Sequence, residues 1–239
     1  MAVINKKNPD KKFCTLIAAA GKGSRMNMDI NKQYIEIGGK PILARTIEIF
    51  ENCSQVDEII LVVSSSDIVY CKQNIVDVFD FGKVTAIVAG GDTRQASVYN
   101  GLLQLNDSCS IVLIHDGARP FVSEESIIES IAIASEFGCA CVAVPVKDTI
   151  KSADSNDIVQ ETLDRSRLWS VQTPQTFRYS LILDAHKKAR EAGFSGTDDA
   201  TLAERLGHPL RLVYGSYYNI KITTEEDLVL AEAIAERDM

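Results

Sequence analysis

Short runs of apolar, β-branched residues alternate with stretches of helical periodicity, and this alternation most constrains the fold of the chain. Predicted strands cover Phe13–Ala19, Glu58–Val63, Val84–Ala89, Ser110–Ile114 and Ala140–Val146. They are apolar on both faces, as strands of a parallel sheet are when helices cover both of its sides. Predicted helices lie between them, over Pro41–Glu51, Asp67–Phe79, Arg94–Leu105 and Ser123–Phe137. The pattern predicts an α/β three-layer sandwich around a mostly parallel, Rossmann-like sheet.

The segment 147–173 interrupts this alternation, because it is polar and has no convincing helical pattern. A stretch of this length without a place in the core is typical of a functional segment. After it we expect helices near Tyr179–Ala192 and Asp198–Leu206, short strands near Leu210–Val213 and Asn219–Ile222, and a last helix opened by Thr224. Thr224 and Asp227 have the spacing of a capping box. The chain, 1–239, is predicted to be a single domain with a flexible basic tail over residues 1–12.

Composition excludes several classes of protein. The formal net charge of −8 argues against general binding of nucleic acid, but it leaves room for a local basic pocket. No apolar run is long enough to span a bilayer, and the run before Gly21 is too short to favour a signal peptide. The six cysteines form no Cys-x-x-Cys pair, so we expect neither zinc nor a redox motif. Buried thiols in a reducing cytoplasm are the expectation.

A loop rich in small residues follows the first predicted strand. It contains Gly21 and Gly23, and such a loop lets backbone N–H groups approach phosphate oxygens. The sequence is not a P-loop, and Met26 stands where the dinucleotide fingerprint requires its third glycine. Two glycines alone favour a plain turn. The nearby cations Arg25 and Lys32 shift the interpretation towards a polyphosphate ligand.

These residues, with further motifs along the chain, resemble the sugar-phosphate nucleotidyltransferases, and most closely the 2-C-methyl-D-erythritol 4-phosphate cytidylyltransferase family. The first motif is Ala-Ala-Ala-Gly-x-Gly-x-Arg-Met over 18–26, followed by Lys32-Gln33-Tyr34. The other matches are 90–94 with Ser97, His115–Pro120, Val144–Thr149, Asp164-Arg165, Gln172–Gln175, Thr197–Asp199 and Asn219–Thr223. Most of these matches are weak individually, but their joint occurrence in the family's order, from Thr15 to Ala233, is specific.

The resemblance implies transfer of a cytidylyl group from CTP to 2-C-methyl-D-erythritol 4-phosphate, with release of pyrophosphate, in non-mevalonate isoprenoid biosynthesis. The attacking phosphate is already ionised at neutral pH, so the reaction needs positioned cations rather than a general base. By resemblance Arg25 and Lys32 stabilise the transition state, and Mg²⁺ bridges the oxygens of the triphosphate. The alternative is that both side chains are solvated surface charges.

The resemblance also implies a set of nucleotide-binding residues near the glycine-rich loop and a second glycine turn. They are Ala18, Ala19, Ala20, Gly21, Gly23, Gly90, Gly91, Ser97, Gly117 and Ala118. Ser97 has the alternative interpretation of a serine on a helix surface. Gly117 departs from the alanine that the family often has. Asp116 either holds Mg²⁺, directly or through water, or orients nearby loops, and the sequence leaves these alternatives open.

For the second substrate, the resemblance implies contacts from Asp116, Thr149, Arg165, Thr197 and Lys221. By the same resemblance, Arg165 and Lys221 hold the phosphate and count with Arg25 and Lys32 among the catalytic residues. It also implies that residues 147–172 form an arm that crosses to a second subunit, in a homodimer with shared active sites. His115 is expected to pack or to hydrogen-bond rather than to bind metal, and His186 and His208 to be surface or structural residues. Trp169 and Phe177 are expected to anchor the arm.

Two other functions remain open at this stage. A ribitol-5-phosphate cytidylyltransferase is the nearest, although its first loop tends towards Gly-Gly where this chain has Ala19-Ala20. A nucleotide-binding regulator that has lost turnover would not need Arg25, Lys32, Arg165 and Lys221 together.

Overall fold

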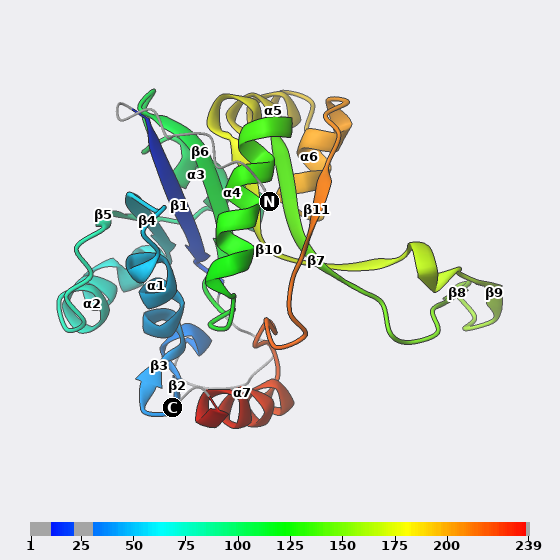
Figure 1. Cartoon of the computed structure of the whole chain (residues 1–239), viewed down its shortest axis with the longest axis horizontal. Helices are drawn as coiled ribbons and strands as arrows, with labels where there is room; N and C mark the ends of the chain where they lie inside the picture. Colours follow the sequence, from blue (N-terminus) through cyan, green and yellow to red (C-terminus); the bar gives the residue numbers. More distant parts are fainter. Residues whose placement is uncertain (1–10, 22–30, 238–239) are drawn as a thin grey trace.

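The central layer of the structure is one sheet of seven strands. The computed structural model describes residues 11–21 and 31–237. The strands of this sheet are β1 (Lys12–Ala19), β4 (Glu58–Val63), β5 (Val84–Ala89), β6 (Cys109–Asp116), β7 (Cys139–Pro145), β10 (Trp169–Arg178) and β11 (Arg211–Tyr214). They lie in the order β11-β7-β10-β6-β1-β4-β5, and among these described strands β10 alone is antiparallel to its neighbours (Figure 1).

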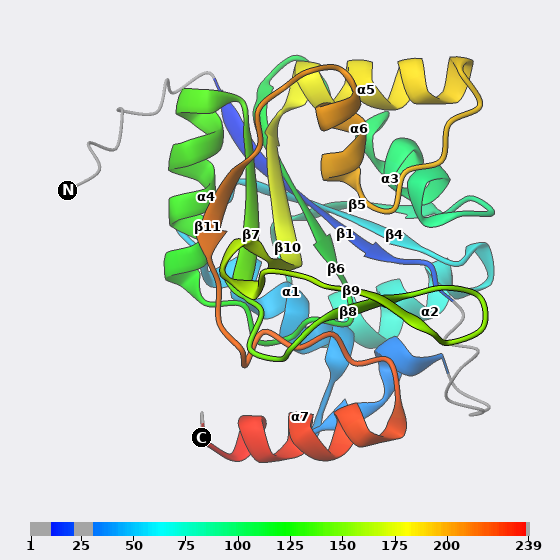
Figure 2. The same cartoon turned by 90° about the vertical axis from the view of Figure 1, so that its right-hand side faces the viewer.

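Helices cover both faces of the sheet (Figure 2). One face packs against α1 (Ile42–Asn52), α2 (Ile68–Cys71) and α4 (Glu124–Phe137), and the other against α3 (Arg94–Leu102), α5 (Tyr179–Glu191) and α6 (Asp199–Arg205). Successive side chains of β1 point to opposite faces of the sheet. Ile17 packs among apolar residues on the side of α1, α2 and α4, and Leu16 packs among those on the side of α3, α5 and α6. The predicted three-layer α/β sandwich with a mostly parallel sheet is confirmed.

The strands predicted from apolar runs are all present, whereas one predicted helix has a different form. Residues expected to form a continuous helix over Asp67–Phe79 begin with a 3₁₀ turn at Ser65–Asp67 and continue through α2. A π-helical turn then follows at Lys72–Val76. Such short turns interrupt the regular hydrogen-bond pattern of an α-helix.

The strand β10 was not predicted, and the reason is its polar sequence. Gln175 and Thr176 are buried in it with partners on the helices: Gln175 Nε2 donates to Asp198 Oδ2 at 2.7 Å, and Thr176 Oγ1 donates to Ser130 Oγ at 2.8 Å. The expectation that Phe177 anchors the arm is wrong. Its side chain is fully buried in the core between the sheet and the helices, because β10 lies between β6 and β7.

The short strand predicted at Asn219–Ile222 is also absent, and these residues are irregular. The chain passes the carboxyl end of β6 there, and residues 219–222 pair with none of the described strands. Instead, the Ile222 N–H donates to the Ala118 carbonyl at 2.9 Å, and the Asn219 side chain donates to the Thr173 carbonyl at 3.0 Å. Helix α7 (Glu225–Arg237) follows and packs near the small hairpin of β2 (Glu36–Ile37) and β3 (Lys40–Pro41).

The start of α7 has the expected capping box. The Thr224 N–H donates to Asp227 Oδ2 at 2.9 Å, and the Asp227 N–H donates to Thr224 Oγ1 at 3.4 Å. This reciprocal pair satisfies backbone donors that the first turn of a helix leaves without partners.

Residues 147–168, called the arm below, project from the body of the molecule (Figure 1). The arm carries a small antiparallel hairpin of β8 (Lys151–Ala153) and β9 (Val159–Thr162). The end of the predicted arm, from Trp169 onwards, belongs instead to β10. Trp169 lies at the base of the arm, edge-to-face with Tyr214 at a centroid distance of 4.9 Å.

The cysteines are buried free thiols, as predicted. Residues 1–10 of the expected basic tail lie outside the described residues, whereas Lys12 is the first residue of β1. In the part of the chain that the structure describes, none of the helices combines the length and the apolar character needed to cross a bilayer.

Candidate active site

A pocket of about 750 Å³ lies at the carboxyl ends of β1, β4, β5 and β6. In chain order β4 and β5 extend the sheet to one side of β1, whereas β6 lies on its other side. Ligands of open α/β sheets bind beyond the carboxyl ends at such a change of direction. The lining residues are Ala18, Ala19, Ala20, Gly21, Lys32, Gln33, Ser64, Ser65, Gly90, Gly91, Asp92, Thr93, Arg94, Ser97, Asp116, Gly117, Ala118, Lys221 and Thr223.

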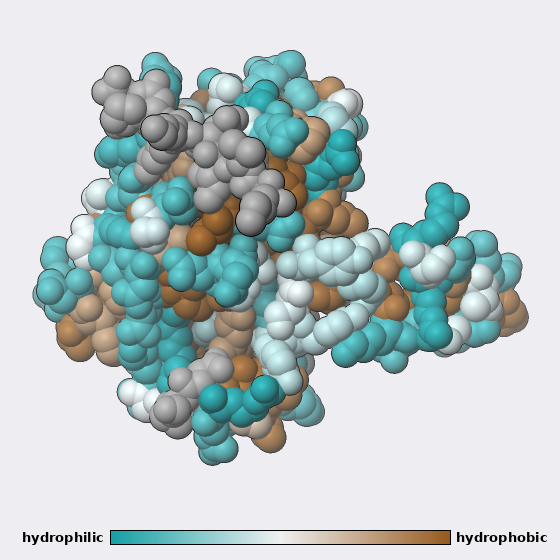
Figure 3. All heavy atoms as spheres, viewed as in Figure 1, coloured by the Kyte–Doolittle hydropathy of each residue, from teal (hydrophilic) through white to brown (hydrophobic). Residues whose placement is uncertain are grey.

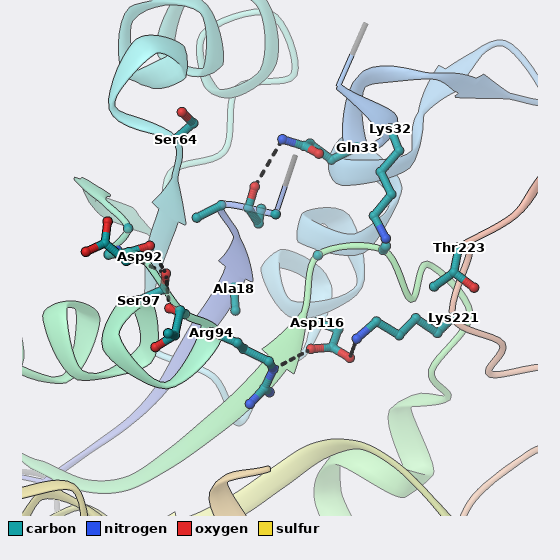
Figure 4. A pocket seen from close by; sticks show the side chains of 18 of the residues that line it. Ala18, Lys32, Gln33, Ser64, Asp92, Arg94, Ser97, Asp116, Lys221 and Thr223 are labelled. Atoms are coloured by element: carbon teal, nitrogen blue, oxygen red, sulfur yellow. Dashed lines mark hydrogen bonds and ion pairs between the residues drawn. The ribbon is translucent and has the colours of Figure 1, made fainter. Parts of the chain in front are cut away.

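Two glycines and one glutamine shape the wall beside the end of β1. Gln33 is buried, and its Nε2 donates to the Ala19 carbonyl at 3.0 Å (Figure 4). A Cβ at Gly90 would collide with the Cβ of Ala20, and one at Gly117 would come within 2.8 Å of the Cβ of Ala19. The wall is therefore backbone and small side chains, as the close approach of a phosphate or a base requires.

Ser97 lies beneath the second glycine turn. It is 4% exposed, so the alternative of a serine on a helix surface is wrong. Its Oγ accepts from the Gly91 N–H at 3.0 Å and donates to the Thr93 carbonyl at 2.9 Å. Thr93 in turn caps α3, accepting from the Ala96 N–H at 3.0 Å. The hydroxyl of Ser97 thus fixes the turn and at the same time lines the pocket.

Asp116, the last residue of β6, is surrounded by cations at the floor of the pocket (Figure 4). Its Oδ1 accepts from Arg94 Nε at 3.1 Å, and its Oδ2 lies 2.8 Å from Lys221 Nζ and 3.6 Å from Arg119 Nε. Burial alone would raise the pKa of Asp116, but Arg94 and Lys221 lower it, so the net pKa lies far below the ordinary value. Asp116 is therefore ionised at neutral pH.

His115, next to Asp116, faces the core and supports the floor. Its Nε2 donates to the Arg119 carbonyl at 3.0 Å, so its Nδ1 accepts from the Thr173 hydroxyl at 3.1 Å. The same hydroxyl accepts from the Asp116 N–H at 3.1 Å. Burial lowers the pKa of His115 to about 4, which keeps the ring neutral. The expectation that His115 packs and hydrogen-bonds agrees with these contacts.

Lys32 and Lys221 approach the pocket from opposite ends of the chain. Lys32 lies in the 3₁₀ turn Lys32–Tyr34, and its Nζ donates to the Ile222 carbonyl at 3.1 Å. Lys221 precedes that carbonyl, and 37% of its side chain is exposed. The irregular segment that carries Lys221 therefore also binds the ammonium group of Lys32 (Figure 4).

Three predicted site residues that the structure describes, Thr149, Arg165 and Thr197, do not line this pocket. Gly23 and Arg25 lie outside the described residues. Thr149 and Arg165 are exposed on the arm, where Arg165 Nη1 donates to the Lys147 carbonyl at 2.9 Å. Thr197 is exposed before α6, with its Oγ1 3.1 Å from Thr201 Oγ1. Among the described residues, one chain thus brings together the predicted nucleotide-binding residues, Lys32, Asp116 and Lys221, but not Thr149, Arg165 or Thr197.

Comparison with known proteins identifies the family of the chain. Residues 13–237 match the family described as 2-C-methyl-D-erythritol 4-phosphate cytidylyltransferase (IspD). The chain belongs to this family. A relative of that name from Alkaliphilus oremlandii is 52% identical over 223 residues, covering 93% of this chain and 94% of the relative. Another, from Caldanaerobacter subterraneus, is 50% identical over 217 residues, covering 91% and 96%.

Solved structures with related names have the same fold. The 4-diphosphocytidyl-2C-methyl-D-erythritol synthase from Anaerococcus prevotii superposes with a TM-score of 0.85 at 36% identity, over 95% of this chain and 97% of that one. The 2-C-methyl-D-erythritol 4-phosphate cytidylyltransferase from Thermus thermophilus gives 0.76 at 33% identity, over 93% and 98%. The family resemblance predicted from the motifs is confirmed.

Sequence reasoning assigned no role to several residues that the IspD fold brings to this site. Arg94 and Arg119 were quoted within motifs, but their contacts with Asp116 were not predicted. Arg94 also pairs with Asp199 on α6, and Asp199 with His186 on α5. Both histidines were predicted to be surface or structural residues. His186 is fully buried, which agrees with a structural role, and His208 is partly exposed.

The pocket has few oxygen ligands for a metal. Within the described residues, no group of three or more histidine, cysteine, aspartate or glutamate side chains could hold a metal ion. In the described part of the chain, the carboxylates that line the pocket are Asp92 and Asp116, and both oxygens of Asp116 already face cations. Mg²⁺ is commonly bound by one or two carboxylates together with substrate phosphates and water. The donor set therefore fits a magnesium ion held mainly by a bound triphosphate.

Proposed function

We propose that the protein transfers a cytidylyl group from CTP to 2-C-methyl-D-erythritol 4-phosphate in non-mevalonate isoprenoid biosynthesis. The products are 4-diphosphocytidyl-2-C-methyl-D-erythritol and pyrophosphate. Membership of the IspD family supports this activity. The observation in the structure that carries it is a single pocket in which glycine-walled backbone meets two lysines and a buried carboxylate. Such a pocket has a surface for a nucleoside triphosphate on one side and cations for a second phosphate on the other.

The reaction joins two anions, and the pocket supplies positive charge for it. A phosphate oxygen of the acceptor forms a bond to the α-phosphorus of CTP, while the bond from that phosphorus to the bridging oxygen breaks and pyrophosphate leaves with its electron pair. Lys32 would stabilise the negative charge that develops at the α-phosphate. Arg25, which lies outside the described residues, is proposed for the same role from the family resemblance.

The nucleotide would occupy the wall formed by Ala18–Gly21, Gly90, Gly91, Ser97, Gly117 and Ala118, with Gly23 proposed from the resemblance. Gly90 and Gly117 line this wall with backbone alone, and neither position has room for a side chain. Ser97 holds the Gly91 N–H, so the shape of this wall is set before a ligand binds. A rigid, preformed wall favours selection among bases by the fit of their edges.

The acceptor phosphate would bind to Lys221, with Asp116 near the polyol. Thr197, which does not line the pocket, is proposed for a further polar contact from the family resemblance. Thr149 and Arg165 are proposed to come from the arm of a second copy, because in one chain the arm points away from the body (Figure 1). Figure 3 shows the arm standing clear of the body, with hydrophobic side chains at its free end, where Ile158 and Val159 are exposed. A two-fold homodimer would cover these side chains.

We also propose that the protein uses Mg²⁺ and works in the cytoplasm. Mg²⁺ would neutralise the triphosphate of CTP, and Asp116 would reach it through water because both of its oxygens have cationic partners. The chain is proposed to work in the cytoplasm, where its six buried free thiols would stay reduced.

A pyrophosphate-release assay tests this function. The purified protein is given CTP, ATP, GTP or UTP with either 2-C-methyl-D-erythritol 4-phosphate or ribitol 5-phosphate. We expect turnover with CTP and the methylerythritol phosphate, and poor turnover with every other pair. Equal turnover with ribitol 5-phosphate, or a preference for another nucleotide, would contradict the assignment. Binding of CTP without turnover would favour a nucleotide-binding regulator.

A further inference from the structure

Behind the wall of the pocket, a chain of polar contacts leads from Asp116 into the layer of α5 and α6. Asp199, the first residue of α6, is only 1% exposed. Its Oδ2 accepts from Arg94 Nη1 at 2.6 Å, and its Oδ1 accepts from His186 Nε2 at 3.1 Å. Arg94 lines the pocket, whereas Asp199 and His186 do not. The contact between Asp199 and the pocket therefore runs through Arg94.

Arg94 connects two carboxylates through different nitrogens of one planar group. Its Nε donates to Asp116 on β6, and its Nη1 donates to Asp199 on α6. A guanidinium is rigid, so an orientation fixed at one nitrogen also fixes the direction of the other donors. Burial alone would raise the pKa of Asp199, but Arg94 and His186 lower it below the ordinary value. Asp199 is thus a charged, fixed anchor at neutral pH.

The anchor is itself held from a second helix. The side chain of His186 is fully buried on α5, and its ring stacks on Tyr99 of α3 at an interplanar angle of 17°. Neither Tyr99 nor His186 lines the pocket. Packing of α3, α5 and α6 therefore fixes the position of the Asp199 carboxylate independently of any ligand.

We propose that Asp199 is a positioning residue for the pocket: through Arg94 it fixes the Asp116 carboxylate, and this keeps Lys221 available to the phosphate of the acceptor. Oδ1 of Asp116 is held by Arg94, while Oδ2 contacts Lys221. When Arg94 is no longer oriented, Oδ1 also becomes free to accept from Lys221, and a carboxylate that holds the ammonium group with both oxygens competes more strongly with the phosphate of the acceptor. The assignment of Lys221 to the acceptor phosphate rests on the proposed function.

A simple electrostatic role for Asp199 predicts the opposite effect. Loss of its carboxylate adds one net positive charge near a pocket that binds anions, which would lower the KM of both substrates. Positioning through Arg94 instead raises the KM of the acceptor and leaves that of CTP unchanged. The sign of the change in KM therefore separates the two roles.

The experiment compares Asp199→Ala, Asp199→Asn and the matched control Glu204→Gln. Glu204 is an exposed acid on the same helix α6 and does not line the pocket, so its substitution removes one negative charge from α6 without a change at Arg94. We expect Asp199→Ala to raise the KM of the methylerythritol phosphate roughly tenfold, the scale of one lost hydrogen bond to a charged group, with the KM of CTP within about twofold. Asp199→Asn keeps an acceptor for Arg94 and should give an intermediate value. The control should match the wild type.

A second readout does not depend on turnover. The ¹⁵N–¹H resonance of Arg94 Nε, assigned by its disappearance in Arg94→Lys, should exchange with water at least about tenfold faster in Asp199→Ala. If Asp199→Ala does not fold, Asp199→Asn serves for both measurements. If the Arg94 Nε proton exchanges with water at the wild-type rate, or if the KM of both substrates is lowered, the positioning role is overturned. If the wild type shows no turnover, the proposed function fails, and the resonance alone decides whether Asp199 orients Arg94.

Discussion

Lys32 is the described residue that we propose to stabilise the negative charge at the α-phosphate of CTP. We predict that Lys32→Ala lowers kcat by roughly 10²-fold or more, the usual scale for losing one donor to a transition state. Steady-state kinetics with both substrates, together with a circular dichroism spectrum to check the fold, measures this effect. Arg25→Ala is expected to act similarly. A Lys32→Ala variant with near-wild-type kcat would exclude the proposed stabilisation of charge.

Lys221 belongs to the acceptor side, and its loss should affect binding of that substrate more than that of CTP. We predict that Lys221→Ala raises the KM of the methylerythritol phosphate roughly tenfold or more, because a charge-assisted contact to phosphate is lost. Lys188→Ala is the matched control, since Lys188 is exposed on α5 and pairs with Asp184 outside the pocket. Equal increases in both KM values would argue against separate binding sides.

The buried ring of His115 predicts a pH dependence of stability. Its pKa is about 4 in the folded chain and about 6.5 when unfolded, so the unfolded chain binds a proton first as the pH falls. The free energy of unfolding should therefore decrease from about pH 6.5 down to pH 4, by about 3 kcal/mol in all. Urea unfolding at several pH values measures it. His115→Gln should flatten the slope in this window, and an unchanged slope would show that another group causes it.

Single residues also show where sequence reasoning succeeds and where it ends. Asp116 and Lys221 were predicted to act together because both stand in family motifs. The link from Arg94 to Asp199 was not predicted. The two residues are 105 positions apart, and they meet because α3, α5 and α6 pack on the same face of the sheet. No local pattern carries that information.

At the scale of elements, the end of β5 and the start of α3 form the glycine turn on which the nucleotide side depends. We predict that Gly90→Ala raises the KM of CTP and destabilises the fold by about 1–3 kcal/mol, because the new methyl group would collide with Ala20. Gly82→Ala is the control, since its Cβ would meet only a Glu51 side-chain oxygen at 3.6 Å. CTP kinetics and urea unfolding compare the two. A Gly90→Ala variant that resembles Gly82→Ala would mean that the wall can move.

The strands illustrate why some elements are visible in a sequence and others are not. Strands such as β1 and β6 are apolar on both faces, so their sequence alone predicts them. In β10 the buried side chains of Gln175 and Thr176 have hydrogen-bond partners on other elements, which removes the apolar signal without removing burial. Residues 219–222 show the opposite case: their pattern predicted a strand, but they pair with none of the described strands and are irregular.

At the scale of the whole molecule, the pocket of one chain contains Lys32 but not the predicted arm residues Thr149 and Arg165. The arm projects away from its own body and adds nothing to the core of that body (Figure 1). A second copy placed by a two-fold axis would exchange arms reciprocally, since such an interface uses the same surface on both partners. The central claim is therefore that two chains complete each active site.

Activity of mixed dimers tests this claim most directly. Lys32→Ala and Arg165→Ala chains, each inactive alone, are co-expressed with different tags, and the mixed dimers are purified through both tags. If arms are exchanged, one site of the mixed dimer carries both lesions and the other carries neither. We predict that pyrophosphate release returns to about half of the wild-type rate, the share of one intact site in two. Folded mixed dimers that remain inactive would contradict the shared active site.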